Sequence, residues 1–251
     1  MNVDGGVLQA FETTVVDEEK KTFVNTEVNE NINGIVVFKR STKYIRYLNL
    51  ILKRIMDIVG SLVGIVILIP LTVIVKVINI LNKDYGPIFY SQERIGRYGK
   101  TFKMYKFRSM VLNAEEKLKK ILEEDEAARE EYSVYKKLKK DPRITPIGNV
   151  LRKTSLDEFP QFINVLKGEM SLVGPRAYLP VEKEDMGSKY RIIISHKPGI
   201  TGLWQVSGRS DVTFEERLEL DLDYHEKVNL LVDIKILLKT VNVVFNRNGA
   251  E

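Results

Sequence analysis

Two adjacent carboxylates are the residues of this sequence best suited to chemistry. Asp157 and Glu158 stand side by side in the stretch "TSLDEFPQ", after two hydroxyl residues and before a proline. A carboxylate can act as a covalent nucleophile at phosphorus. The same two acids can equally be no more than the first turn of a helix, so their surroundings must decide.

The local sequence fits the start of a helix. Ser155 is followed three residues later by Glu158, which is the spacing of a capping box. Acids in a first turn also suit the helix dipole. Pro160 follows so closely that it predicts an irregular first turn. On these residues alone, a helix cap and a reactive dyad both stay open.

Cations elsewhere in the chain favour the dyad. Phosphate chemistry needs cations that take up charge on the phosphoryl oxygens, and arginine can bind phosphate through two parallel bonds. Gly174 and Gly208 each stand close before a candidate arginine, and glycine lets the backbone approach an anion. The candidate cations are Lys106, Arg108, Arg152, Arg176 and Arg209. Each is weak evidence alone, but jointly they indicate a phosphate-binding site.

An apolar segment precedes these residues. Residues 58–75 carry no charge, which reaches the length expected of a membrane segment. A straight helix over 58–81 would be about 36 Å long, against a hydrocarbon core of about 30 Å. Pro70 would kink it, and the basic residues on both flanks would tend to stay cytoplasmic. We therefore expect residues 49–82 to form a re-entrant hairpin bent at Pro70, with a spanning helix and a buried core helix as alternatives.

The remaining segments are expected to be short strands and helices. Alternation and aromatic residues in "PIFYSQ" and "TFKMYKFRSM" predict two strands. Residues 111–140, rich in Ala, Glu, Lys and Leu, predict one or two solvated helices. The stretches around "GPR" and "SGR" are expected to be loops with short strands. The C-terminal segment carries a helical stripe that either packs on the domain or lies on the membrane surface: Leu230, Ile234, Leu237, Leu238 and Val241.

Composition narrows the classes of protein further. The 251 residues include no cysteine, which excludes disulfides, thiolate chemistry and zinc sites built on sulfur. The two histidines, His196 and His225, lie apart, so a His-rich metal site is not expected. The net charge of +5 gives no indication of nucleic-acid binding. The first residues have neither the basic start nor the apolar run of a secretory signal.

From about Lys53 onward, the chain resembles the bacterial sugar transferases, which are monotopic phosphoglycosyl transferases acting on polyprenyl phosphates. The matching stretches are "KRIMD", "GPIFYSQERIGRYGKTFKMYKFRSM", "DPRITPIGNVLRKTSLDEFPQFINVLKGEMSLVGPR" and "KPGITGLWQVSGRSDVTFEERLELD". They cover most of the chain in the right order, so the resemblance does not rest on one motif.

The resemblance implies a reaction. A hexose 1-phosphate would pass from a UDP-sugar, UDP-glucose or UDP-galactose, to undecaprenyl phosphate with release of UMP, starting a capsule or exopolysaccharide repeat. Asp157 matches the nucleophile, which forms an acyl-phosphate, and Glu158 matches its partner. Mg²⁺ would assist, with the two dyad carboxylates as its expected ligands. Arg152 and Arg176 match residues near the phosphates, and the other candidate cations match less directly.

The resemblance also implies an architecture. The expected fold is α/β and mainly helical, with a re-entrant membrane helix-break-helix, amphipathic helices and a small cytosolic catalytic domain with short strands. Residues 1–48 would form a polar extension with a strand or two and residues 49–82 the hairpin. Residues 83–251 would form the catalytic domain, which includes the insert 111–140. The protein would lie on the inner leaflet of the bacterial cytoplasmic membrane. Residues 1–48 could pair with a second chain, so a homodimer stays open.

Two residues depart from the family pattern. Some members have a serine before the hairpin proline, whose hydroxyl can satisfy a carbonyl that the proline frees. This chain has Ile69 there, so another group must do that work. Ala177 stands where a proline is common after "GPR", and only a loop adjustment is expected.

Two other functions compete with this interpretation. A glycosyltransferase that releases UDP would typically hold its metal with a D-x-D motif, which Asp221 and Asp223 could imitate. That stretch is expected to be helical, however, and residues two apart do not share a helix face. A membrane-tethered scaffold that binds a partner through residues 111–140 is the non-catalytic alternative.

Overall fold

The computed structural model describes residues 31–32, 35–36, 41–208 and 212–245. Contacts divide the chain into two units, residues 1–50 and residues 51–251, and the second is called unit 2 here. Most of the 1–48 extension lies outside the described residues. Within it, β1 (Asn31–Ile32) and β2 (Ile35–Val36) pair as an antiparallel ladder.

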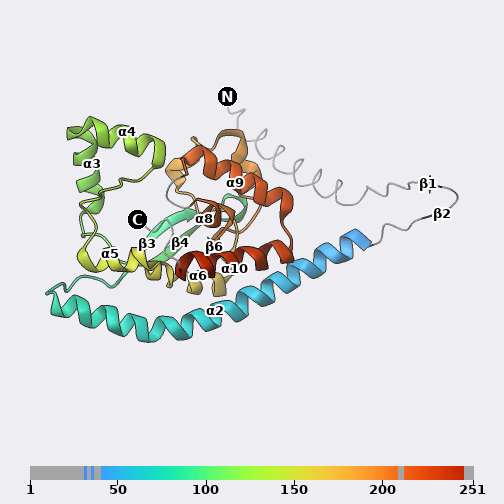
Figure 1. Ribbon diagram of the computed structural model, residues 1–251, viewed down its shortest axis with the longest axis horizontal. Coiled ribbons are helices and arrows are strands. Elements are labelled where there is room, and N and C mark those ends of the chain that lie inside the picture. Colours follow the sequence, from blue (N-terminus) through green and yellow to red (C-terminus); the bar gives the residue numbers. More distant parts are fainter. Residues whose placement is uncertain (1–30, 33–34, 37–40, 209–211, 246–251) are drawn as a thin grey trace, which may run out of the picture. The chain divides into compact units, whose positions relative to one another are not determined.

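Unit 2 is mostly helical, as expected, and contains two small sheets. The antiparallel hairpin of β3 (Phe89–Ile95) and β4 (Thr101–Phe107) confirms the two strands predicted in this stretch. The strands β5 (Ser171–Val173) and β6 (Gly199–Thr201) pair in parallel. In Figure 1, α9 (Phe214–Lys227) lies at the top of unit 2, and α10 (Leu230–Phe245) lies lower, near α2.

The insert predicted over 111–140 forms α3 (Ala114–Glu124) and α4 (Glu126–Tyr135), neither of which contains a buried residue. Asp125 accepts a hydrogen bond from the Ala128 amide and so caps α4. The other helices of unit 2 are short: α5 (Pro146–Lys153), α6 (Gln161–Lys167), α7 (Tyr190–Ile193) and α8 (Leu203–Ser207). Single 3₁₀ turns fill the gaps at Arg97–Gly99, Leu156–Glu158, Pro180–Glu182 and Gly187–Lys189.

The apolar segment forms part of one long helix, α2 (Ser41–Leu81), which continues through Pro70. The hairpin expected at Pro70 is therefore not what the structure shows, and Figure 1 shows the ribbon curving without reversing. Pro70 is exposed, so its ring does not disturb the packed face of the helix. The Thr72 hydroxyl donates to the Leu68 carbonyl at 2.8 Å, which supplies side-chain support next to the proline.

Packing explains why α2 does not turn back. Its buried residues recur at helical spacing on both sides of Pro70, so a single face contacts the rest of unit 2: Asp57, Ser61, Gly64, Leu68, Val75 and Asn79. Leu68 and Val75 join one hydrophobic cluster with Phe107 and Leu151. A Cβ added to Gly64 would lie 2.3 Å from the Phe162 ring, so only glycine allows this approach. A reversal at Pro70 would remove one half of this face from the domain.

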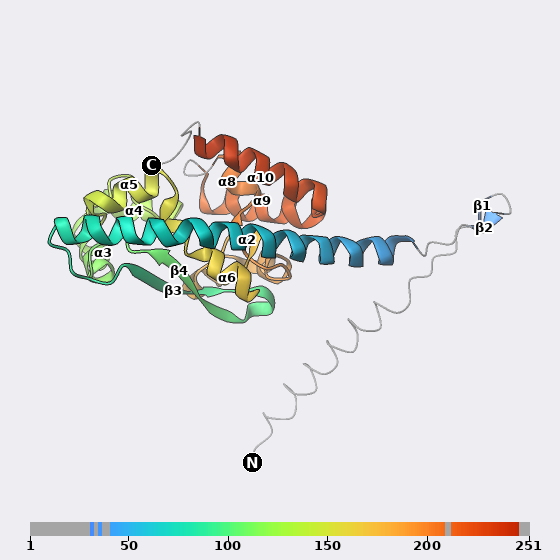
Figure 2. The ribbon, with the colours of Figure 1, turned by 90° about the horizontal axis from the view of Figure 1, so that it is seen from below.

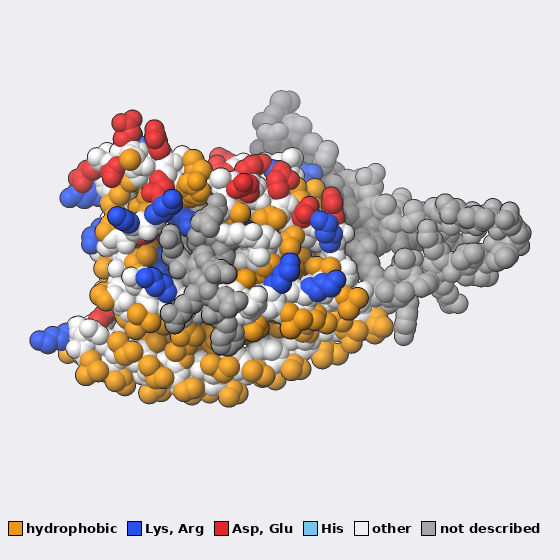
Figure 3. Space-filling model, in the orientation of Figure 1, with side chains coloured by type: hydrophobic (Ala, Val, Ile, Leu, Met, Phe, Trp, Pro, Cys, Tyr) orange, Lys and Arg blue, Asp and Glu red, His pale blue; other side chains and the backbone are white. Residues whose placement is uncertain are grey.

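The opposite face of α2 is apolar and exposed. Tyr47–Leu81 has the length and hydropathy of a membrane segment, and only 22% of its most apolar stretch is buried. Figure 3 shows hydrophobic side chains lining the lower edge of the molecule, where Figure 1 places α2. On α10, the predicted stripe divides: Ile234, Leu238 and Val241 are exposed, whereas Leu237 packs against the core. Unit 2 therefore presents an apolar surface suited to a membrane.

Candidate functional site

The dyad lies on a 3₁₀ turn, Leu156–Glu158, between α5 and α6. The irregular first turn predicted from Pro160 is thus confirmed. Ser155 has φ of 57°, in the left-handed region, and its side chain makes no capping hydrogen bond. The capping-box interpretation of Ser155 and Glu158 is therefore wrong. A non-glycine residue in this region stores strain, a feature that clusters at functional sites.

Apolar anchors hold the turn in place. Leu156 and Phe159, on either side of the dyad, pack into the cluster formed by α2, β4 and α5. Behind them, Asn164 of α6 is fully buried and ties that helix to β4: its Oδ1 accepts from the Tyr105 amide, and its Nδ2 donates to the Lys103 carbonyl. The rigid contact between α6 and β4 brings Lys106 to the dyad.

Lys106 bridges the two acids. Its Nζ lies 2.7 Å from Glu158 Oε1 and 3.8 Å from Asp157 Oδ2. The Asp157 side chain is 10% exposed, whereas the Glu158 side chain is 36% exposed. The Asp157 carboxylate is thus enclosed and the Glu158 carboxylate is partly exposed, with one ammonium between them.

The two acids titrate differently. Burial raises the pKa of Asp157 to about 6, with Glu158 adding to the rise while Lys106 and Arg152 oppose it. Burial also opposes the ionisation of Glu158, but Lys106, Arg176 and Arg94 outweigh it and lower the pKa of Glu158. At pH 7 both are therefore largely ionised. The charge on Asp157 is the less well stabilised of the two, so Asp157 is the more basic carboxylate. A base or nucleophile tuned toward neutral pH is typical of an active site.

Of the other predicted cations, Arg152 and Arg176 are near the dyad. Arg152, in the last turn of α5, donates to the Ser109 hydroxyl at 2.9 Å and lowers the pKa of Asp157. Arg176 follows β5, and its charge lowers the pKa of Glu158. Among the described residues, the Arg176 guanidinium donates no hydrogen bond, which leaves it ready for an anion.

Arg108 and Arg209 stand differently. Arg108 is buried, and its guanidinium forms an ion pair with Asp84 at 2.8 Å and donates to the Pro87 carbonyl. The structure thus uses Arg108 to fix the loop that follows α2, and a role at the phosphates would require it to leave that pair. Arg209 lies outside the described residues.

The dyad matches the donor set of a magnesium site. The described part of the chain contains no group of three or more metal-ligating side chains. Mg²⁺ in phosphoryl-transfer sites is usually held by only one or two carboxylates, with substrate phosphates and water completing its shell. The adjacent carboxylates of Asp157 and Glu158 fit that arrangement.

The sequence did not single out Arg94 and Arg217. Arg94 of β3 donates to the Ala177 carbonyl at 2.9 Å, and Arg217 of α9 is only 4% exposed. Both lie near Arg176, since the Arg176 charge affects the pKa of each. Arg94 lies in the matched stretch "GPIFYSQERIGRYGKTFKMYKFRSM", but nothing in its spacing relates it to a dyad more than sixty residues later.

The competing D-x-D motif is not assembled. Asp221 is fully buried and accepts from the Arg176 amide and the Tyr178 hydroxyl. Asp223 instead forms an exposed ion pair with Lys227. The two acids therefore have separate structural partners, and Asp221 serves to hold the backbone of the "GPR" loop.

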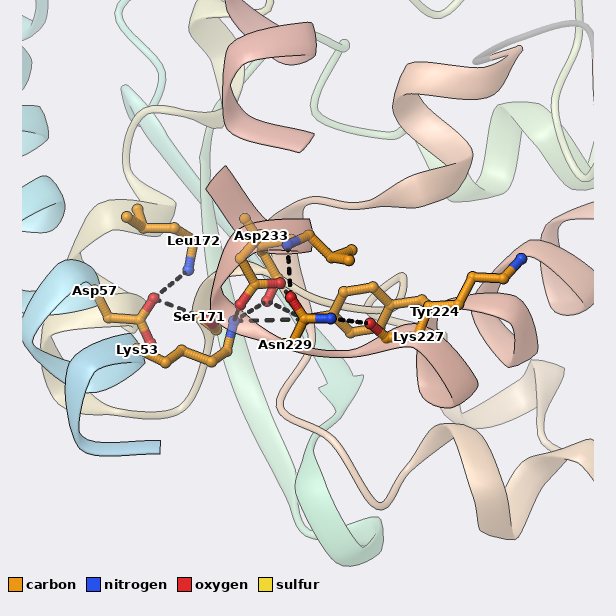
Figure 4. A network of polar contacts seen from close by, with 10 residues as sticks. Lys53, Asp57, Ser171, Leu172, Tyr224, Lys227, Asn229 and Asp233 are labelled. Carbon is orange, nitrogen blue, oxygen red and sulfur yellow. Dashed lines mark hydrogen bonds and ion pairs between the residues drawn. The ribbon is translucent and has the colours of Figure 1, made fainter. Parts of the chain in front are cut away.

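A buried polar network connects α2 to the strand that leads into that loop (Figure 4). The Lys53 Nζ donates to the Val173 carbonyl at 2.8 Å and pairs with Asp233 at 2.6 Å. Asp57, one turn later, accepts from the Ser171 hydroxyl and the Leu172 amide. The apolar helix is thus hydrogen-bonded to β5, just before Gly174, Pro175 and Arg176.

Lys53→Met is expected to destabilise unit 2 by about 2–4 kcal/mol, because it leaves the buried Asp233 carboxylate without its cation. The measurement is chemical unfolding in detergent. Lys120→Met, which breaks an exposed pair with Glu124, is the control and should change the unfolding free energy by less than about 0.5 kcal/mol. Equal effects of the two substitutions would show that the network does not stabilise the fold.

Comparison with known proteins places the chain in a family. The model of the bacterial sugar transferase family matches residues 48–247. A UDP-galactose-lipid carrier transferase of Erwinia amylovora is 46% identical over 216 residues, which are 86% of this chain and 45% of that protein. An undecaprenyl-phosphate galactose phosphotransferase of Salmonella typhimurium is 48% identical over 214 residues, 84% of this chain and 43% of that protein.

A shorter relative is matched nearly from end to end. The exopolysaccharide production protein ExoY of Sinorhizobium fredii is 40% identical over 211 residues, which are 84% of this chain and 93% of that protein. The chain spans less than half the length of the Erwinia and Salmonella proteins. All three matches, like the family model, include the region that carries the dyad. The chain therefore belongs to the bacterial sugar transferase family.

Proposed function

We propose that this protein transfers a hexose 1-phosphate from a UDP-sugar to undecaprenyl phosphate and releases UMP, as the first membrane step of capsule or exopolysaccharide synthesis. The observation that carries the proposal is the enclosed Asp157 carboxylate, with a pKa of about 6, beside Lys106, Arg152 and a partly exposed Glu158. The names of relatives, which include undecaprenyl-phosphate galactose and glucose-1-phosphate transferases, support the same substrates.

The first step forms a covalent intermediate. An Asp157 oxygen attacks the phosphorus that carries the sugar, and the bond from that phosphorus to the bridging oxygen breaks. UMP leaves with the bridging oxygen, and the sugar phosphate stays on Asp157 as an acyl-phosphate. Lys106 and Arg152 offset the charge that gathers on the phosphoryl oxygens.

The second step releases the product. A phosphate oxygen of undecaprenyl phosphate attacks the same phosphorus, the bond to Asp157 breaks, and the carboxylate is restored. The product is undecaprenyl diphosphate joined to the hexose, so every atom of the donor's sugar phosphate reaches the lipid. Because one site serves both steps in turn, the kinetics are expected to be ping-pong.

Magnesium is part of this proposal. Asp157 and Glu158 are the carboxylates that would hold it, with oxygens of the donor diphosphate. When bound, Mg²⁺ neutralises diphosphate charge and makes UMP a better leaving group. Lys106 pairs with Glu158 at 2.7 Å and keeps that carboxylate ionised, so the ammonium would have to share Glu158 with the metal ion.

The membrane arrangement follows from how α2 packs. The inner face of α2 contacts the rest of unit 2 from Asp57 to Asn79, a length of about 33 Å at 1.5 Å per residue. If this stretch crossed the bilayer, the domain packed against it would have to enter the bilayer too. The basic flanks favour the same side for both ends. The proposal is that α2 lies in the inner leaflet of the cytoplasmic membrane, with the catalytic domain in the cytoplasm.

Cysteine labelling tests this arrangement, because the chain contains no native cysteine. Leu50→Cys and Lys83→Cys place one thiol near each end of the apolar segment. Both should react with a membrane-impermeant maleimide in inside-out vesicles, and neither in right-side-out vesicles. Reaction of the two thiols from opposite sides would establish a spanning helix.

The reaction itself is tested by nucleotide release. Purified protein is mixed with Mg²⁺, undecaprenyl phosphate and a panel of UDP-sugars that includes UDP-glucose and UDP-galactose. We expect UMP from one hexose donor, dependent on the lipid for multiple turnovers. UDP as the product would identify an ordinary glycosyltransferase. Absence of any nucleotide product would favour the scaffold interpretation instead.

A further inference from the structure

Two arginines from separate elements stack on one aromatic ring, and a third arginine lies near one of them. The guanidinium carbons of Arg176 and Arg217 each lie 5.4 Å from the centre of the Trp204 ring. Arg94 lies close to Arg176 and Glu158, because the charges of both affect its pKa. The four residues come from β3, the loop after β5, α8 and α9. The cluster therefore borders the dyad on the Glu158 side.

The cluster contains hydrogen-bond donors that have no partner. Among the described residues, the buried side-chain nitrogens that lack one are the Nε atoms of Arg94, Arg176 and Arg217 and the Nε1 of Trp204. A buried donor without an acceptor is costly, and native structures leave few of them. Two buried acceptor oxygens, Gln205 Oε1 and Asp221 Oδ1, also lack a partner but are not bonded to these four donors. A ligand with several acceptor oxygens would satisfy the donors.

Charge points to the same kind of ligand. No carboxylate within the described residues forms an ion pair with any of the three arginines. Burial first, and the Arg176 charge second, lower the pKa of Arg94 and of Arg217 to about 10. Both remain charged at pH 7, and the charge of Glu182 favours the charged form of each without forming an ion pair with either. Arg176 therefore repels two neighbouring cations, and a bound anion would offset that repulsion.

Hydrogen bonds to other residues of unit 2 account for only part of this arrangement. Arg217 donates through Nη2 to the carbonyls of Tyr135 and Val212, and Arg94 donates through its Nη atoms to Ala177 and Gln92. These bonds fix where the guanidiniums stand. They do not explain why three of them, with the indole N–H, are placed together beside a catalytic acid.

The position of the cluster favours a soluble ligand. Trp204 lies on α8, which contacts α9 and α10, and Arg217 comes from α9. In Figure 1, α9 is at the top of unit 2, α8 lies between α9 and α10, and α2 is at the bottom, while Figure 2, viewed from below, shows α2 in front of the domain. A lipid phosphate would approach from the apolar surface of α2. A nucleotide would approach from the opposite side.

We propose that Arg94 and Arg217, with Arg176 and Trp204, form a subsite for a phosphate monoester, and that its occupant is the nucleotide phosphate that leaves as UMP. The inference rests on the proposed function and adds two arginines and an aromatic residue to it. The subsite holds the leaving phosphate while Asp157 attacks the other phosphorus. It thereby makes departure of UMP, rather than of the sugar phosphate, the easier cleavage.

The chain supplies its own probe, because Trp204 is its single tryptophan. Emission from full-length Asp157→Asn protein in detergent is recorded during titration with UMP, with uridine and with undecaprenyl phosphate. We expect a saturable change with UMP and none with uridine, which lacks the phosphate. Calorimetry with the same three compounds reports binding independently of the tryptophan.

Two variants and one control define the residues. Arg217→Gln and Arg94→Gln should each raise the UMP dissociation constant about 10-fold or more, since each removes a charged donor from an anion. In the active enzyme they should raise KM for the UDP-sugar and leave KM for undecaprenyl phosphate unchanged. Arg97→Gln is the control, because Arg97 also stacks on an aromatic ring, Tyr98, but away from the dyad. Because Arg217 is almost fully buried, thermal unfolding checks that Arg217→Gln still folds. Arg94 is partly exposed, so Arg94→Gln repeats the test where the fold is less at risk.

The outcomes separate this inference from the proposed function. UMP binding that leaves Trp204 emission and both arginine variants unaffected would overturn the subsite, while UMP release by the active enzyme would still stand. A response to undecaprenyl phosphate that depends on the arginines would reassign the subsite to the lipid acceptor and overturn the nucleotide assignment. No UMP binding together with no UMP release would remove both proposals.

Discussion

Asp157→Asn should abolish turnover and at the same time make the protein more stable at pH 7. The amide cannot attack phosphorus, so we expect kcat to fall by roughly 10⁴-fold or more, as when other covalent nucleophiles are removed. UMP release in the presence of both substrates measures the loss. UDP-sugar binding should persist, because Lys106 and the arginines remain.

The gain in stability comes from the raised pKa of Asp157. Burial raises that pKa from 3.8 to about 6, so the folded protein favours the protonated carboxyl. That contribution to stability is fully present below pH 3.8 and is lost as the pH rises through about 6. At pH 7 the wild type therefore carries a destabilising charge that asparagine lacks. We expect a gain of about 1–2 kcal/mol at pH 7, shrinking toward pH 4.

Glu123→Gln, on the exposed face of α3, is the matched control for losing one negative charge. It should change neither turnover nor stability beyond about 0.5 kcal/mol. Substantial activity in Asp157→Asn would contradict the covalent role. Loss of activity together with loss of stability would indicate that Asp157 supports the fold rather than the reaction.

Lys106→Met is the second substitution with a large expected effect. Lys106 is the cation that bridges the dyad, and without it two adjacent carboxylates face each other. We expect activity at pH 7 to fall by about 10²-fold or more, because the charge that offsets the phosphoryl oxygens is lost and less Asp157 is ionised. Initial rates at saturating donor measure this effect.

The pH profile distinguishes these two causes. Asp157 must be ionised to attack, so wild-type activity should be half-maximal near pH 6 and fall as the pH drops. Removing Lys106 raises the pKa of Asp157 further, so the acid limb should move to higher pH and activity should partly recover in alkaline buffer. Lys103→Met, an exposed position on the same strand, should keep the wild-type profile. An unmoved acid limb in Lys106→Met would show that Lys106 does not set the ionisation of Asp157.

The dyad could be predicted from sequence because its evidence is local. Two acids, a proline and nearby hydroxyls stand within eight residues, and the matched motifs supplied the context. The choice between helix cap and reactive pair could not be made there. It depends on the backbone of Ser155 and on Lys106 from a strand some fifty residues earlier.

The arginines show what sequence could not supply. Arg108 and Arg152 carry the same charge, yet one pairs with Asp84 and the other lies near Asp157. Arg94 and Arg217 join Arg176 only through long-range packing of β3, α8 and α9. Charge in a sequence says that a residue can bind an anion, but its partners in the fold decide whether it is free to do so.

The apolar helix shows a different limit. Hydropathy identified the apolar segment, although its helix begins earlier than the predicted segment, at Ser41, and Pro70 suggested a reversal. The stripe of buried residues from Asp57 to Asn79 decides otherwise, because it continues unbroken past the proline. That stripe contains Asp, Ser, Gly and Asn within an apolar run, and their helical spacing is the signal that the helix keeps one face on the domain.

A single measurement tests the central claim most directly. The protein is incubated with Mg²⁺ and the active UDP-sugar in the absence of undecaprenyl phosphate. Released UMP is quantified, and intact-mass spectrometry of the same sample measures the mass of the protein. The account predicts one equivalent of UMP per active site, a mass increase equal to one hexose phosphate, and a peptide map that places it on Asp157. No UMP without the lipid, or a label on another residue, would contradict the covalent role of Asp157.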